Sequence, residues 1–216
     1  MLLNELGRRF EIVLVGPKPF PWCRYTHCAV TRSLDLLAKH NFQPSDVAEV
    51  RVHIGERDMR SVGGWTQEEK QKKLRPESVV DAQFSIPFTV AATLLNGGLS
   101  LEDFTEAKLG GQEVLDLAAR VELVLKPELD DGPMDVKPQI IEIMTRSGTI
   151  YRERVVYPEG NPNNPVTSEK LIAAFRGMAS YAAKQLGSDK IDEAVSTTLR
   201  LEESKDVAAL TTLLTA

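Results

Sequence analysis

A seven-residue segment, EGNPNNP at residues 159–165, limits the fold more than any other feature of this chain. Prolines, a glycine and asparagines in close succession are typical of irregular connecting segments. Before this linker, short apolar runs alternate with amphipathic stretches, whereas every element after it has helical periodicity. The sequence therefore predicts two parts, an α+β body over residues 1–158 and a helical segment over residues 166–216.

Several short runs of the body are interpreted as strands. Residues 139–145 and 149–156 both alternate apolar and polar side chains, and Arg146-Ser147-Gly148 separates them. This pattern predicts an antiparallel β-hairpin with a glycine in its turn. The other predicted strands cover residues 11–15, 49–54 and 121–125. The expected fold class is α+β, an antiparallel sheet with packed helices followed by a helical tail.

The longest helical patterns of the body lie between these strands. Thr26 is the expected N-cap of a helix that reaches about Asn41. A second helix is expected to start at Ser78 or Asp81 and to end at Asn96-Gly97-Gly98, a triplet typical of helix C-termini. Because this second helix is apolar on nearly all sides, it should be buried.

Residues 55–77 separate a predicted strand from this buried helix. They have few apolar side chains and include the charge run EEKQKK at residues 68–73. We interpret the region as a solvated loop with a short polar helix, so its lysines are expected to face solvent.

The helical segment is predicted to form three helices, over residues 168–186, over residues 188–203, and from residue 204 onward. One apolar stripe in the first of them consists of Leu171, Phe175, Met178, Ala182 and Leu186. A stripe of this kind has to be buried against another surface. The body, a partner chain or an absent domain could cover it.

Composition excludes several classes of function. The chain has 26 Lys and Arg residues against 31 Asp and Glu, a formal net charge of -5, so a broad nucleic-acid-binding surface is not expected. No apolar run approaches the roughly 20 residues that span a bilayer. Acidic and basic residues precede the first apolar stretch, unlike in a signal peptide. We therefore expect a cytoplasmic protein that binds neither nucleic acid nor membrane.

The cysteines and histidines do not indicate a metal site. Cys23 and Cys28 are so close in sequence that a disulfide between them would stabilise little. A structural zinc site needs about four ligands, and the spacings of His27, His40 and His53 match no metal motif. We therefore expect reduced thiols and no metal site.

The densest polar chemistry lies in and after the segment GPKPFPW at residues 16–22. Its alternating prolines predict a stiff, extended loop, and the helix start that follows favours anions. Arg24 can bind a carboxylate through two parallel hydrogen bonds, and Lys18 adds a compact positive charge. His27 can transfer a proton near neutral pH. In an acidic chain this cluster suggests a small polyanionic substrate, although a solvated Lys18 and a core-bordering His27 stay open as the simpler interpretation.

Two long motifs resemble the MmgE/PrpD family. KPFPWCRYTH at residues 18–27 is similar to the family pattern K-P-[YF]-P-x-C-R-x-x-H. RPESVVDAQFSIPF at residues 75–88 is similar to R-P-x-x-x-x-D-A-Q-F-S-x-P-[FY]. The stretches 94–104, 151–164 and 170–176 also fit. The family contains 2-methylcitrate dehydratase and is related to cis-aconitate decarboxylase.

The resemblance implies a fold, a reaction and a set of site residues. Family members have a large helical domain and a smaller α+β lid, and their final helices return to the helical domain. The implied activity is that of a carbon-oxygen lyase (hydro-lyase), which acts on small di- and tricarboxylates by proton abstraction and loss of water, without metal or cofactor. Lys18 and His27 match lid positions that face the active-site cleft and are the expected catalytic residues. The expected substrate-binding residues are Lys18, Arg24, His27, Ser85 and Phe88.

The resemblance also implies a partner. The large helical part that precedes the lid in the family is missing from this sequence, so we expect a split or shortened chain that is incomplete alone. A homodimer or a complex with a helical-domain chain is the expected assembly. The alternative is a non-catalytic module that binds carboxylates or a partner chain and has lost the chemistry with the helical domain.

Overall fold

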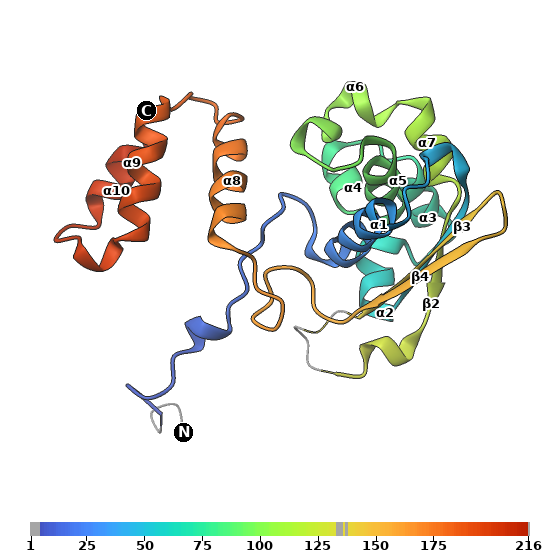
Figure 1. The fold of residues 1–216 in the computed structure, drawn as a ribbon, viewed down its shortest axis with the longest axis horizontal. Coiled ribbons are helices and arrows are strands. Elements are labelled where there is room, and N and C mark those ends of the chain that lie inside the picture. The colour runs from blue at the N-terminus through green and yellow to red at the C-terminus, as the bar shows by residue number, and fades with distance from the viewer. Residues whose placement is uncertain (1–4, 133–135, 137, 216) are drawn as a thin grey trace. The chain divides into compact units, whose positions relative to one another are not determined.

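The computed structural model describes residues 5–132, 136 and 138–215 of the chain. The chain divides into two compact units, Met1–Pro165 and Val166–Ala216 (Figure 1). Within the described residues, no helix combines the length and the apolar character that a membrane crossing requires.

The first unit is built on a four-stranded sheet in the order β2-β1-β3-β4. The strands are β1 (Val47–Ile54), β2 (Val121–Leu125), β3 (Gln139–Thr145) and β4 (Ile150–Val155). β3 and β4 form the expected hairpin. β1 pairs antiparallel with β3 but parallel with β2, because the chain crosses over through helices between β1 and β2. The α+β class is confirmed, with one parallel pair that the sequence pattern did not predict.

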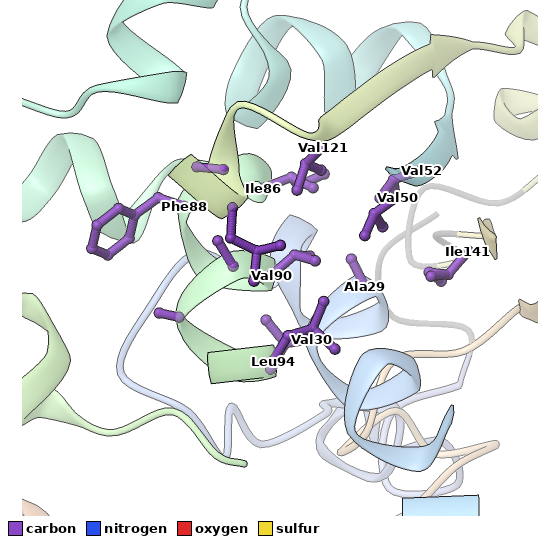
Figure 2. Packing of buried hydrophobic residues seen from close by; sticks show 14 of the residues in the cluster. Ala29, Val30, Val50, Val52, Ile86, Phe88, Val90, Leu94, Val121 and Ile141 are labelled. Carbon is purple, nitrogen blue, oxygen red and sulfur yellow. The ribbon is translucent and has the colours of Figure 1, made fainter. Parts of the chain in front are cut away.

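Helices connect β1 to β2 and cover one face of the sheet (Figure 1). The described helices of this unit are α1 (His27–His40), α2 (Glu56–Asp58), α3 (Gln67–Leu74), α4 (Val79–Gln83), α5 (Ile86–Asn96), α6 (Glu106–Leu109) and α7 (Gln112–Ala118). α1 and α5 pack against each other and against the sheet. Figure 2 shows the resulting core, to which α1 contributes Val30, α5 contributes Val90 and Leu94, and β1 contributes Val52.

The predicted strand over residues 11–15 is wrong. Glu11–Leu14 is a 3-10 turn, and the side chains of Ile12 and Val13 are 74% and 71% exposed. An apolar run becomes a strand only where a neighbouring strand supplies hydrogen bonds. None of the described strands lies beside this run.

The helix that is predicted to start at Ser78 or Asp81 and to end at Asn96-Gly97-Gly98 is divided into α4 and α5. Ser85 interrupts it, because its Oγ accepts a hydrogen bond from the backbone N–H of Phe88 at 3.0 Å and so begins a new helix. Pro87 lacks an N–H and fits the first turn of α5 better than a helix interior. The expected burial of α5 and its end at Gly97, which has a φ of +63°, are confirmed.

Residues 55–77 are only partly solvated. The expected short polar helix is α3, whose side chains are mostly exposed. Met59 and Val62, however, are buried in the core from a π-helical turn, Met59–Gly63. The apolar side chains of Met59 and Val62 therefore pack into the core of the first unit. α3 packs against α5 and against this π-helical turn.

The second unit consists of three described helices, α8 (Ser168–Ala179), α9 (Ser188–Leu199) and α10 (Ala208–Leu214). α8 is shorter than predicted because the chain turns after Ala179, where Ser180 donates to the carbonyl of Gly177 at 2.7 Å. The predicted apolar stripe is therefore interrupted before Ala182 and Leu186. Among the described residues of this unit, Ala194 alone is buried.

Candidate anion-binding site

Close backbone contact with Gly160 holds the proline segment as an extended loop. A Cβ on Gly160 would collide with the carbonyl of Pro17, and Gly160 also has a φ of +85°. A side chain at Gly16 would collide with the carbonyl of Gly160 and with the guanidinium of Arg24. The loop that carries Lys18 is therefore fixed against the segment that follows β4.

Gly160→Ala is expected to lower the free energy of unfolding by about 2 kcal/mol, because strain at positive φ adds to the collision with Pro17. Gly148→Ala is the matched control, since Gly148 has a φ of +84° but open space around a Cβ. Urea unfolding of both variants measures the difference. Equal losses in the two variants would contradict the tight packing of the loop.

Two hydrogen bonds join the loop to Gln83, the last residue of α4. The backbone N–H of Cys23 donates to the carbonyl of Gln83 at 3.1 Å. The side-chain amide of Gln83 donates to the carbonyl of Pro21 at 3.2 Å, across 62 positions of sequence. The fold therefore brings together the two motifs that stand out in the sequence.

A 3-10 turn, Arg24–Thr26, leads from the loop into α1. Thr26 occupies the predicted N-cap position of α1, but its hydroxyl donates to the carbonyl of Cys23 at 2.9 Å and does not cap the helix. The side-chain amide of Gln139 donates to the carbonyl of Tyr25 at 2.7 Å. This bond ties the turn, and with it Arg24, to β3.

His27 is fully buried at the start of α1. Its ring lies edge-on to Phe20 and Trp22, with ring centroids 5.0 and 6.2 Å away, and Nε2 lies 3.3 Å from the carbonyl of Trp22. Burial lowers the pKa of His27 to about 4, against the smaller opposing effect of the Trp22 carbonyl. The positive charges of Arg24 and Lys18 lower this pKa further. The imidazole is therefore neutral near pH 7, and Nε2 carries the proton that is donated to Trp22.

Lys18 is exposed on the loop, and Arg24 is half-buried in the turn. One guanidinium N–H of Arg24 donates to the carbonyl of Pro17 at 3.4 Å. Among the described residues, neither cation forms an ion pair with a carboxylate. Both charges lie close enough to His27 to lower its pKa. Their joint contact with a ligand stays a prediction.

Ser85 and Phe88, the other expected substrate-binding residues, are buried at the start of α5. Oγ of Ser85 donates to the carbonyl of Lys73 at 2.5 Å and caps α5. The ring of Phe88 is 1% exposed, and its centroid lies 6.2 Å from that of Phe104. In this structure both side chains stabilise the fold, and their contact with a ligand stays a prediction.

Lys73 is a further cation of this region, which the sequence pattern did not indicate. Its Nζ donates to the carbonyls of Phe84 at 2.8 Å and Ser61 at 3.3 Å. Burial raises the pKa of the Cys23 thiol, and the charges of Lys18 and Lys73 both oppose that shift. In the sequence, Lys73 ends a charge run that is typical of a solvated helix. Only its hydrogen bonds to Phe84 and Ser61 distinguish it from the other lysines of this run.

Cys28, His40 and His53 make contacts that stabilise the fold. Burial raises the pKa of Cys28 to about 12, which makes it a poor nucleophile. His40 stacks on Tyr151 with ring centroids 4.0 Å apart, and His53 lies 3.2 Å from a carboxylate oxygen of Glu142. In the part of the chain that the structure describes, no three His, Cys, Asp or Glu side chains gather as a potential metal site.

Fold and site together define a class of protein. It has an α+β domain, in which the cationic proline loop is hydrogen-bonded to the motif at residues 75–88, and a helical unit that follows this domain. The chain belongs to the MmgE/PrpD family, because residues 20–198 match the MmgE/PrpD C-terminal domain. This match confirms the resemblance that the two motifs indicate.

Two relatives have an assigned activity. Cis-aconitate decarboxylase of Homo sapiens and cis-aconitate decarboxylase of Mus musculus are each 29% identical to the chain over 140 residues. The aligned region covers 64% of this chain but 28% of each relative. The chain therefore corresponds to a minor part of the length of these relatives.

Proposed function

We propose that the chain is the C-terminal, lid-containing part of a lyase that acts on small tricarboxylates. The observation that supports this proposal is the pair of hydrogen bonds between the two family motifs. Lys18 and Arg24 lie close enough to His27, and Lys18 and Lys73 close enough to Cys23, to affect the pKa of these two groups. Among the described residues, none of these three cations pairs with a carboxylate, although the chain has a net charge of -5. A ligand with several carboxylates would form the charge-assisted bonds that the cluster lacks.

The proposed roles follow from exposure and charge. Lys18 and Arg24 bind substrate carboxylates. When the proton next to a carboxylate is removed, the ammonium of Lys18 stabilises the negative charge that develops on the substrate. His27 is buried, and its pKa of about 4 makes it a weak base in the free chain. A bound polyanion raises that pKa, so His27 becomes a better proton acceptor only once the substrate is in place.

Loss of water from a 2-methylcitrate-like acid is the reaction we propose. Loss of CO2 from a cis-aconitate-like acid is the second candidate, because both relatives are named cis-aconitate decarboxylase. Negative charge develops next to a carboxylate in either reaction, so the same cations serve both. Release of CO2 distinguishes the second reaction from the first.

An open apolar face on the second unit supports the proposal that the chain binds a partner. Leu171 and Phe175 of α8, Leu199 of α9 and Leu214 of α10 line an open apolar pocket of about 320 Å³. A unit that buries so little of its own apolar surface is not stable without further contacts. We propose that a helical-domain chain or a second copy of this chain covers this face. An assembly that binds tricarboxylates but never converts them would favour the alternative, a carboxylate-binding module.

Lys18→Ala is expected to weaken citrate binding by about 10- to 150-fold, the equivalent of one charge-assisted hydrogen bond of about 1.5–3 kcal/mol. Titration calorimetry of the full chain in its assembly measures the affinity. Lys39→Ala is the matched control, because Lys39 is exposed near the other end of α1 and pairs with Glu153 at 3.1 Å. Unchanged affinity in Lys18→Ala, or an equal loss in Lys39→Ala, would contradict the assignment of the site.

A further inference from the structure

Lys73 lies at the end of α3 but is not an ordinary surface lysine. Its Nζ donates to the carbonyls of Phe84 and Ser61, and its own carbonyl accepts a hydrogen bond from Ser85. These contacts tie α3 to the turn between α4 and α5. The two carbonyls engage two of the three N–H groups of the ammonium, so one donor is left for another acceptor.

The side chain of Lys73 is half-buried at this position. Burial lowers the pKa of Lys73, and nearby Asp81, Cys23 and Glu69 oppose that shift. No carboxylate forms an ion pair with Nζ among the described residues. The ammonium thus bonds to backbone carbonyls, one of them at the C-terminal end of α4, and to no carboxylate, so it remains able to bind an anion.

Lys73 is connected to the proline loop by a short path of bonds. The carbonyl of Phe84, which it binds, follows Gln83, and the carbonyl of Gln83 accepts the N–H of Cys23. Cys23 directly precedes Arg24, and its pKa responds to the charges of both Lys18 and Lys73. Lys73 is therefore bonded to the residue next to Gln83, which in turn holds the backbone just before Arg24.

We propose that Lys73 is a ligand-binding residue of this anion site and that its third N–H donates to a carboxylate of the substrate. The inference rests on the proposed function for the class of ligand. Lys18, Arg24 and Lys73 then supply one cation for each carboxylate of a tricarboxylate. Lys73 accordingly sets the preference of the site for tricarboxylates over dicarboxylates.

Titration calorimetry of the full chain with citrate and with succinate tests this role. Lys73→Met is expected to weaken citrate binding by about 10- to 150-fold, the loss of one charge-assisted bond, and to leave succinate binding nearly unchanged. Lys73→Arg keeps the charge and should retain the preference for citrate. Lys70→Met, at an exposed position of the same helix, is the control and should bind both acids like the wild type.

A measurement on the wild type covers the case that Lys73→Met does not fold. The 13Cε resonance of Lys73 is expected to shift when citrate is added, whereas that of Lys70 should not. The role of Lys73 is contradicted by an unshifted resonance, by unchanged citrate affinity in a folded Lys73→Met, or by equal losses for citrate and succinate. Absence of citrate binding to the wild type would contradict it as well.

Turnover separates this inference from the proposed function. If the assembled enzyme converts a tricarboxylate while Lys73→Met binds citrate normally, the inference about Lys73 fails and the lyase function stands. If citrate binding depends on Lys73 but no assembly converts a tricarboxylate, the lyase function fails and the role of Lys73 stands.

Discussion

Acidification from pH 7 to about pH 4 is expected to lower the free energy of unfolding by about 3 kcal/mol through His27. The pKa of His27 is about 4 in the folded chain, against an ordinary value of 6.5. Between these values the unfolded chain binds more protons than the folded chain, so stability rises with pH in this window. The contribution of the neutral imidazole is complete above pH 6.5 and is lost as the pH falls toward 4.

Urea unfolding at about pH 7 and about pH 4 measures this effect, and the substitution His27→Phe isolates it. Phenylalanine keeps an aromatic ring beside Phe20 and Trp22 but does not titrate, so the variant should lose about 3 kcal/mol less than the wild type on acidification. His40→Phe is the control, since it preserves stacking on Tyr151. A His27→Phe variant with the same pH dependence as the wild type would show that His27 is not buried and neutral in the folded chain.

The double substitution of Phe175 and Met178 by aspartate is expected to dissociate the assembly that we propose for the second unit. Phe175 lines the apolar pocket of α8 to α10, and Met178 is 39% exposed one turn further along α8. Two carboxylates on this face would have to be desolvated on association, at a cost of several kcal/mol each. Light scattering and size-exclusion chromatography measure the change.

The first unit provides the reference for this experiment. Its sheet and core contain no residue of α8, so its circular dichroism and unfolding should be unchanged in the double variant. Ala173→Asp places a single carboxylate on the opposite side of α8, at an exposed position, and should leave the assembly intact. A wild type that stays monomeric at high concentration, both alone and in the presence of a helical-domain chain, would contradict the proposed assembly.

Elements with strong local signals could be predicted from the sequence. The hairpin of β3 and β4 follows from two alternating runs around Gly148, and the end of α5 follows from Gly97. The apolar run at residues 11–15 predicts a strand but forms a 3-10 turn. An apolar pattern does not show whether a neighbouring strand is available to pair with it. The parallel pairing of β1 with β2 also depends on the crossover between them, which no short pattern describes.

In the candidate site, too, some features could be predicted from local sequence and others depend on the folded structure. Lys18, Arg24 and His27 could be identified because they are close in sequence and lie in a specific motif. The neutrality of His27 could not, since it depends on rings and charges that fold around it. Lys73 was hidden in a charge run, because its bonds to Ser61 and Phe84 exist only in the folded chain.

A turnover assay tests the central claim most directly. The full chain is assembled with a helical-domain chain and incubated with 2-methylcitrate or with cis-aconitate, and alkene formation and CO2 release are followed. We expect the wild-type assembly to convert at least one of these acids, and Lys18→Ala to lower kcat/KM by about 10- to 150-fold. A folded wild-type assembly that binds citrate but converts neither acid would contradict the lyase function.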